Sequence, residues 1–136
     1  MSKLYKIAVI DDDEVFQLII KKQMEMRKFT CEILSFFNGQ TAIEYLNANL
    51  NSPEKLPQLI MLDVNMPIKD GWEFLEDYKL LPSKIKKSIV LYMVTSSVIQ
   101  TDIDRAAKNE DVHGYISKPI TSQNLDDILM QLPPIN

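Results

Sequence analysis

The stretch that decides the fold runs from residue 59 to residue 67 and reads LIMLDVNMP. Its first four residues form a continuous apolar run, which is typical of a strand that is buried on both faces of a parallel sheet. Asp63 follows this run directly, and Pro67 ends the segment. We therefore predict a strand over residues 59–64 that presents a carboxylate at its carboxyl end.

Similar short apolar runs lie on both sides of this stretch, and longer amphipathic segments separate them. The further candidate strands are residues 6–10, 31–36, 89–94 and 114–117. The candidate helices are one that begins after Asp13, with a buried face of Phe16, Ile19, Ile20 and Met24, and residues 40–50, 72–80, 98–109 and 123–132. A strand followed by a helix, five times, predicts an α/β doubly wound parallel sheet with helices on both faces.

The composition excludes several classes of protein. The 136 residues suit one compact domain, and no apolar stretch is long enough for a membrane span or an export signal, so we expect a cytoplasmic protein. Cys31 is the only cysteine, which rules out an intramolecular disulfide or a Cys-based zinc site. The net charge of -4 has the wrong sign for nucleic-acid binding. We interpret Lys84, Lys86 and Lys87 as a solvated loop before a strand.

Acidic side chains gather where the predicted strands end. Doubly wound sheets bind ligands beyond the carboxyl ends of their strands, where we place Asp11, Asp12, Asp63, Thr95 and Lys118. Three carboxylates at one edge repel one another unless a cation binds. Because all the donors are oxygens, the pattern favours Mg²⁺, for which Mn²⁺ should substitute.

A carboxylate beside Mg²⁺ can also act as a nucleophile toward a phosphoryl group. The Lys118 ammonium and the Thr95 hydroxyl are suited to binding the phosphoryl oxygens that the metal leaves free. We therefore predict that Asp63 forms an aspartyl-phosphate. Any one of these residues is common at a strand end, and the prediction depends on their joint occurrence.

Four motifs, in this order, make the chain resemble the response-regulator receiver family of two-component signalling. They are Ile10-Asp11-Asp12, residues 61–67 with Asp70-Gly71, residues 93–96, and residues 114–119. The resemblance implies a flavodoxin-like fold with strand order 2-1-3-4-5. It also implies that residues 1–136 form a single receiver domain without an output domain, which signals by associating with another protein.

The resemblance assigns a role to each candidate residue. Asp63 would accept the phosphoryl group from a histidine kinase or a histidine phosphotransfer protein. Asp12 would bind Mg²⁺ directly, Asp11 would act through a metal-bound water, and Asn65 would offer its backbone carbonyl.

The resemblance also implies a switch. Thr95 would move to hold the phosphoryl group, and Tyr115 would swing inward behind it. This movement would change the surface formed by the fourth helix, the fifth strand and the fifth helix, which would meet an unnamed protein target or a second copy of the chain. The peptide bond between Lys118 and Pro119 is expected to be cis.

Three other functions fit the sequence less well. A Mg²⁺-dependent phosphatase of the haloacid dehalogenase type would need an aspartate at the position of Asn65. A flavin or dinucleotide site would need a Gly-rich or Ser/Thr-rich phosphate loop after the first strand, where this chain has three aspartates. His113 could carry phosphate, but it lies at the opposite end of the sheet from the acidic edge, and we interpret it as an ordinary exposed histidine. We expect a signalling module and not an enzyme.

Overall fold

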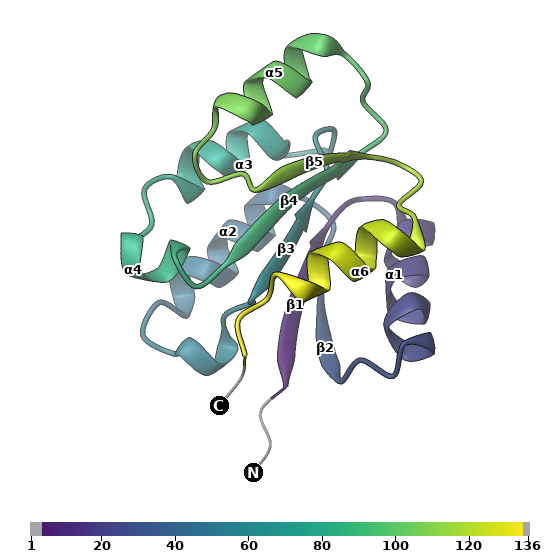
Figure 1. Ribbon diagram of the computed structural model, residues 1–136. Helices are drawn as coiled ribbons and strands as arrows, with labels where there is room; N and C mark the ends of the chain where they lie inside the picture. The colour runs from purple at the N-terminus through teal and green to yellow at the C-terminus, as the bar shows by residue number, and fades with distance from the viewer. Residues whose placement is uncertain (1–3, 135–136) are drawn as a thin grey trace.

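The computed structural model describes residues 4–134 and contains one five-stranded parallel sheet (Figure 1). Its strands are β1 (Tyr5–Ile10), β2 (Cys31–Phe36), β3 (Leu59–Leu62), β4 (Val90–Thr95) and β5 (Gly114–Ser117). They pair in the order β2-β1-β3-β4-β5. The predicted fold class and strand order are therefore confirmed.

Helices cover both faces of the sheet. They are α1 (Glu14–Met26), α2 (Gly39–Ala48), α3 (Gly71–Tyr78), α4 (Ser83–Lys86), α5 (Gln100–Lys108) and α6 (Ser122–Met130). Figure 1 shows α1 and α6 on one face and α2, α3 and α5 on the other. The expected fourth and fifth helices are thus α5 and α6. None of the helices in residues 4–134 has the length and apolarity needed to cross a membrane.

The central strands supply alternate residues to two separate cores. In β1, Ile7 and Val9 pack against α1 and α6, whereas Ala8 and Ile10 pack against the helices of the other face. All four side chains are buried. This alternation explains why the sequence of a strand covered on both faces reads as a continuous apolar run.

The ends of the predicted elements differ from the observed ends by one or two residues, except that β2 and β5 match fully. A larger error concerns the lysines before β4. They were predicted to lie in a loop, but Ser83–Lys86 forms the short helix α4, because Ile85 packs against the core and Lys86 pairs with Asp111. A 3-10 turn, Pro53–Lys55, was also not predicted.

The predicted buried face of α1 was wrong at one residue. Ile19 is 43% exposed, while Gln17 is buried in the interior. The Gln17 Nε2 atom donates to the backbone carbonyls of Val9, Asp11 and Phe36 at 2.9, 3.0 and 3.2 Å. These hydrogen bonds offset the cost of burying the amide nitrogen, and they fix α1 against the carboxyl ends of β1 and β2.

The start of α1 follows the prediction. The side chain of Asp13 accepts hydrogen bonds from the backbone N–H groups of Val15 and Phe16, so Asp13 is the N-cap. This role accounts for the third aspartate of the run after β1. It leaves Asp11 and Asp12 for the edge of the sheet.

Candidate functional site

Three carboxylates meet at the carboxyl edge of the sheet. Asp11 and Asp12 follow β1, and Asp63 follows the neighbouring strand β3, where its N–H donates to the Ile10 carbonyl at 3.0 Å. One oxygen from each of the three carboxylates lies within 4.8 Å of the others. Asp11 and Asp63 are 1% and 7% exposed, and Asp12 is exposed. The pairing of β1 with β3 therefore brings together residues that are about 50 positions apart in the chain.

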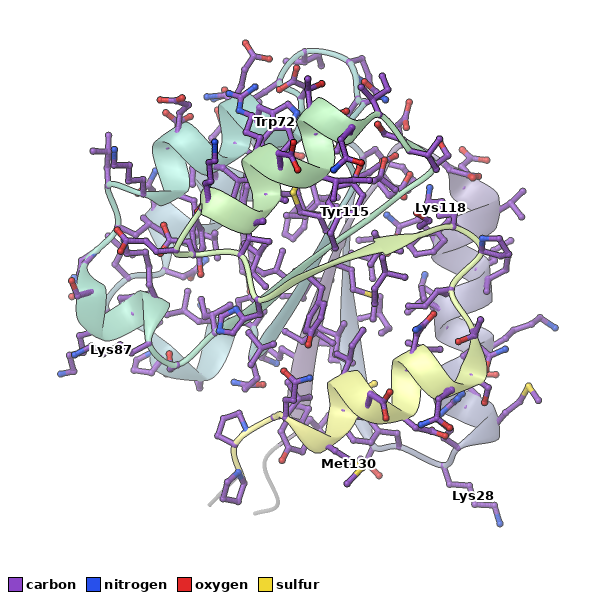
Figure 2. All side chains as sticks on the ribbon, turned by 45° about the horizontal axis from the view of Figure 1, so that its top comes forward. Lys28, Trp72, Lys87, Tyr115, Lys118 and Met130 are labelled. Atoms are coloured by element: carbon purple, nitrogen blue, oxygen red, sulfur yellow. The ribbon has the colours of Figure 1, made fainter. Side chains whose placement is uncertain are left out.

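The ammonium group of Lys118 reaches these carboxylates. Lys118 follows β5, and its Nζ atom lies 2.7 Å from Asp11 Oδ2 and 3.6 Å from Asp63 Oδ2. The ammonium also lies 4.5 Å from the centre of the Phe16 ring. The peptide bond to Pro119 is cis, as the resemblance implied. Figure 2 shows Lys118 at the same end of the sheet as Tyr115 and Trp72.

The surroundings of the site shift the pKa values of Asp11 and Lys118. Desolvation raises the pKa of Asp11 from 3.8 to about 6, although the hydrogen bond from Lys118 and the N–H of Asp13 act in the opposite direction. Burial also lowers the pKa of Lys118, but the hydrogen bond to Asp11 and the neighbouring negative charges outweigh it, so the net shift is upward. Three carboxylates thus face one firmly protonated lysine.

The donor set fits a hard divalent cation. Asp11 Oδ2 is buried, and its partner within residues 4–134 is the Lys118 ammonium, 2.7 Å away. One ammonium does not neutralise three carboxylates, so a bound cation would relieve the remaining repulsion. With oxygen donors alone, and with the exposed Asp12 at the solvent side, the group suits Mg²⁺ or Mn²⁺ better than zinc.

The loop after β3 holds Asp63 from the other side. Asp63 Oδ1 accepts the N–H of Val64 at 2.7 Å, and the N–H of Gly71 donates to the Val64 carbonyl at 2.8 Å. A Cβ atom at position 71 would collide with the Asp63 carbonyl oxygen, so glycine is required there. Asn65 lies exposed in this loop, two residues after Asp63.

Thr95 and Tyr115 are joined through Ser97. Thr95 is the last residue of β4 and is fully buried, and its Oγ1 atom accepts the N–H of Ser97 at 3.2 Å. The Tyr115 hydroxyl donates to the Ser97 carbonyl at 2.8 Å. Burial raises the pKa of Tyr115, which therefore stays protonated and able to donate. The two predicted switch residues thus contact the same residue of the loop between β4 and α5.

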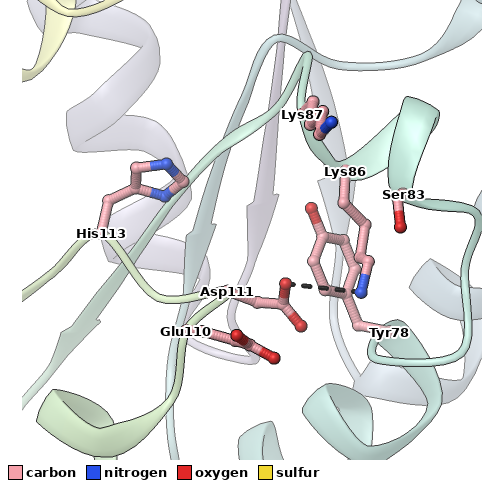
Figure 3. Close-up of a pocket in the computed structure, with 7 residues that line it drawn as sticks. All are labelled: Tyr78, Ser83, Lys86, Lys87, Glu110, Asp111 and His113. Carbon is pink, nitrogen blue, oxygen red and sulfur yellow. Dashed lines mark ion pairs between the residues drawn. The ribbon is translucent and has the colours of Figure 1, made fainter.

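A hollow lies at the end of the sheet opposite the acidic edge. Figure 3 shows its lining, which includes Tyr78, Lys86, Asp111 and His113, and its volume is about 450 Å³. The Lys86 Nζ atom lies 3.5 Å from Asp111 Oδ1. His113 is exposed, as predicted, and its Nδ1 atom accepts the N–H of Leu91 at 3.1 Å. This histidine is far from the acidic edge.

Comparison with known proteins decides the family. The family model of the response regulator receiver domain matches residues 7–130. The chain belongs to this family. The expected relationship is therefore confirmed.

Individual relatives agree with this assignment. A two-component response regulator from Cytophaga hutchinsonii has a crystal structure with a TM-score of 0.84 and 28% identity, covering 96% of this chain and 97% of that one. The response regulator Rcp1 from Synechocystis is 28% identical over 132 residues, which are 95% of this chain and 84% of Rcp1. Its Mn²⁺-bound form has been solved and has a TM-score of 0.76 at 22% identity, covering 96% of this chain and 99% of that one. The phosphorylated cyanobacterial phytochrome response regulator RcpA has a TM-score of 0.76 and 26% identity, covering 92% and 89%.

Two residues near the site were not found from the sequence. Gln17 holds the ends of β1 and β2, and Asp102, in α5, binds the side chains of Ser97 and Trp72. Gln17 could have been suspected, because it lies beside the apolar face of an amphipathic helix. No sequence signal marks Asp102, whose partners lie on other elements.

Proposed function

We propose that Asp63 accepts a phosphoryl group from a sensor histidine kinase or a histidine phosphotransfer protein in a reaction that requires Mg²⁺. The observation that carries the proposal is the grouping of Asp63 with Asp11 and Asp12 within 4.8 Å, beside the Lys118 ammonium. Receiver domains accept phosphoryl groups from such donors. The relative RcpA, solved in its phosphorylated form, supports the same chemistry.

Asp12, Asp63 and the backbone carbonyl of Asn65 would hold the Mg²⁺ directly, and Asp11 would hold it through a water. When bound, the ion would neutralise negative charge on the transferring phosphoryl group. The excess of the three carboxylates over the Lys118 ammonium supports this arrangement. Mn²⁺ should substitute, which agrees with the Mn²⁺-bound form of Rcp1.

The transfer forms a bond between a carboxylate oxygen of Asp63 and phosphorus, while the bond between phosphorus and the donor's histidine nitrogen breaks. The Lys118 ammonium would donate to one phosphoryl oxygen and the Thr95 hydroxyl to another. Thr95 ends β4 and Lys118 follows β5, and the two strands end at the same edge of the sheet. We propose that the protein is a signalling module and not an enzyme with a separate substrate, and that it catalyses only this transfer and the hydrolysis of its own aspartyl-phosphate.

We further propose that the signal leaves through the surface of α5, β5 and α6. The hydrogen bonds of Ser97 with Thr95 and Tyr115 offer a route from the phosphoryl group to this surface. Val98 and Ile99, just before α5, are exposed and apolar, as protein-binding surfaces often are. The target is another protein or a second copy of the chain.

The remaining expectations stay predictions. They are a single receiver domain over residues 1–136, a cytoplasmic location, and the absence of nucleic-acid and membrane partners.

The proposal is tested by the intact mass of the protein after incubation with acetyl phosphate and Mg²⁺. The wild type should gain one phosphoryl group, and chelation of Mg²⁺ should prevent the gain. Asp63→Asn should gain none. The matched control is Asp111→Asn, which changes a carboxylate at the opposite end of the sheet and should behave as the wild type. Labelling of Asp63→Asn to the level of the wild type would overturn the assignment.

A further inference from the structure

One carboxylate in α5 joins a loop and a helix beside the site. The Ser97 hydroxyl donates to Asp102 Oδ2 at 2.6 Å, and the Trp72 indole N–H donates to Asp102 Oδ1 at 3.2 Å. Ser97 belongs to the loop between β4 and α5, and Trp72 belongs to the first turn of α3. Because each oxygen of Asp102 binds a different element, the side chain connects the two.

Ser97 is bound through every polar group that it has. Its N–H donates to Thr95 Oγ1, its carbonyl accepts the Tyr115 hydroxyl, and its own hydroxyl donates to Asp102. The residue is 8% exposed. Hydrogen bonds to a charged partner are stronger than neutral ones, so the bond to Asp102 should contribute most to fixing the loop.

The other partner of Asp102 leads back to Asp63. Trp72 directly follows Gly71, whose N–H donates to the carbonyl of Val64, the residue next to Asp63. The indole is 8% exposed, and the Arg105 guanidinium lies 4.4 Å from the centre of its ring. The start of α3 is therefore fixed both to the loop that carries Asp63 and to α5.

We propose that Asp102 is a positioning residue for the phosphoryl-acceptor site. It holds the loop after β4 against α3, so that Thr95 and Tyr115 are already arranged for the phosphorylated state. This role rests on the proposed function of Asp63. Without the carboxylate, the loop samples other arrangements, and a phosphoryl group binds only the fraction of molecules that is correctly arranged. Asp102 thus acts through Ser97 and touches no reacting atom.

The test is the affinity for beryllofluoride, an analogue of the phosphoryl group, measured by calorimetry in saturating Mg²⁺. Asp102→Ala should weaken binding about tenfold, the usual size for loss of a charged hydrogen bond. Asp102→Asn should bind with an affinity between those of Asp102→Ala and the wild type, because the amide can still accept from Trp72 and donate to the Ser97 hydroxyl but carries no charge. The matched control is Asp104→Ala, which removes an exposed carboxylate of the same helix and should have no effect. The affinity for Mg²⁺ alone should be unchanged in all three variants.

A double-mutant cycle separates positioning from a general loss of stability. Ser97→Ala should also weaken beryllofluoride binding, and combining it with Asp102→Ala should add little, because both changes break the same hydrogen bond. If the two effects multiply, or if Asp102→Ala binds as tightly as the wild type, the role of Asp102 is refuted. If the wild type itself fails to bind beryllofluoride, the phosphoryl-acceptor proposal fails first and the role of Asp102 falls with it.

Discussion

Both ends of the sheet hold a lysine beside an aspartate, but the two surroundings differ. At the carboxyl end, Lys118 lies 2.7 Å from Asp11, and two further carboxylates share its site. At the amino end, Lys86 lies 3.5 Å from Asp111, in a hollow that is also lined by Lys87 and Glu110 (Figure 3). The charges balance at the amino end, whereas negative charge is in excess at the carboxyl end.

The polar groups of the amino end are also largely satisfied by the protein itself. The Lys86 ammonium donates to the Lys79 carbonyl at 3.0 Å, and His113 Nδ1 accepts the Leu91 N–H. A hollow of about 450 Å³ therefore does not by itself mark a functional site. The excess negative charge of three carboxylates beside one ammonium distinguishes the acidic edge more sharply than the size of a cavity does.

The largest expected difference between the two ends is in Mg²⁺ binding. Asp12→Ala should abolish it, which means a loss of roughly 100-fold or more, since even residues that only support a metal ligand contribute up to about that amount. The fold should stay intact, because removing one of three like charges relieves repulsion in the metal-free protein. Calorimetric titration with Mg²⁺ measures the loss. Asp111→Ala is the control at the amino end, and an unchanged affinity in Asp12→Ala would refute the ligand role.

The next largest effect is on the pH dependence of stability. Asp11 has a pKa of about 6 in the folded protein against 3.8 ordinarily, so the folded state binds the proton more tightly. The resulting stabilisation is fully present below pH 3.8 and is lost as the pH rises through about 6. Without Mg²⁺, Asp11 should therefore add about 1 kcal/mol to the free energy of unfolding when the pH falls from 7 to 5.

Urea denaturation of the wild type and of Asp11→Asn, each in a chelator, isolates this contribution. The variant should lack the rise toward pH 5. In saturating Mg²⁺ the trend should reverse, because the metal binds the ionised carboxylates, which predominate at pH 7. Identical pH profiles for the two proteins would show that Asp11 titrates normally.

A smaller effect is expected from the ion pair of the amino end. Lys86→Met should lower the free energy of unfolding by up to about 1 kcal/mol, because the pair is long at 3.5 Å even though its side chains are only 18% and 14% exposed. Mg²⁺ affinity and phosphorylation should not change, because the charge balance at the acidic edge is untouched. A clear loss of phosphorylation in this variant would mean that the two ends are coupled.

The smallest effect concerns the backbone. Ile68, in the loop after β3, and Lys28, after α1, have φ values of 69° and 55°, in the left-handed region that disfavours side chains. Ile68→Gly should raise the free energy of unfolding by about 0.5 kcal/mol, after the entropy cost of glycine is subtracted from the relieved strain. Lys28→Gly should gain less, because lysine is not β-branched. Thermal unfolding of the two variants checks the order.

The sequence was informative where a structural feature depends on adjacent residues. The apolar run before Asp63 predicted a buried strand and a carboxylate at its end, and the same reasoning placed Asp11 and Lys118 at one edge. It failed where burial depends on contacts between elements. Gln17 is buried where the backbone carbonyls of Val9, Asp11 and Phe36 accept hydrogen bonds from its amide nitrogen. The short helix α4 forms where Ile85 packs against the core. Neither partner set can be read from neighbouring residues.

Trp72 can serve as a fluorescence probe beside the site. It is the only tryptophan in the chain, and its indole binds Asp102 while Arg105 lies over the ring. Any rearrangement of the loop after β4 that moves Asp102 must alter the surroundings of this one chromophore. The protein therefore carries its own optical reporter, and its intrinsic fluorescence should report any displacement of this loop in real time without an added label.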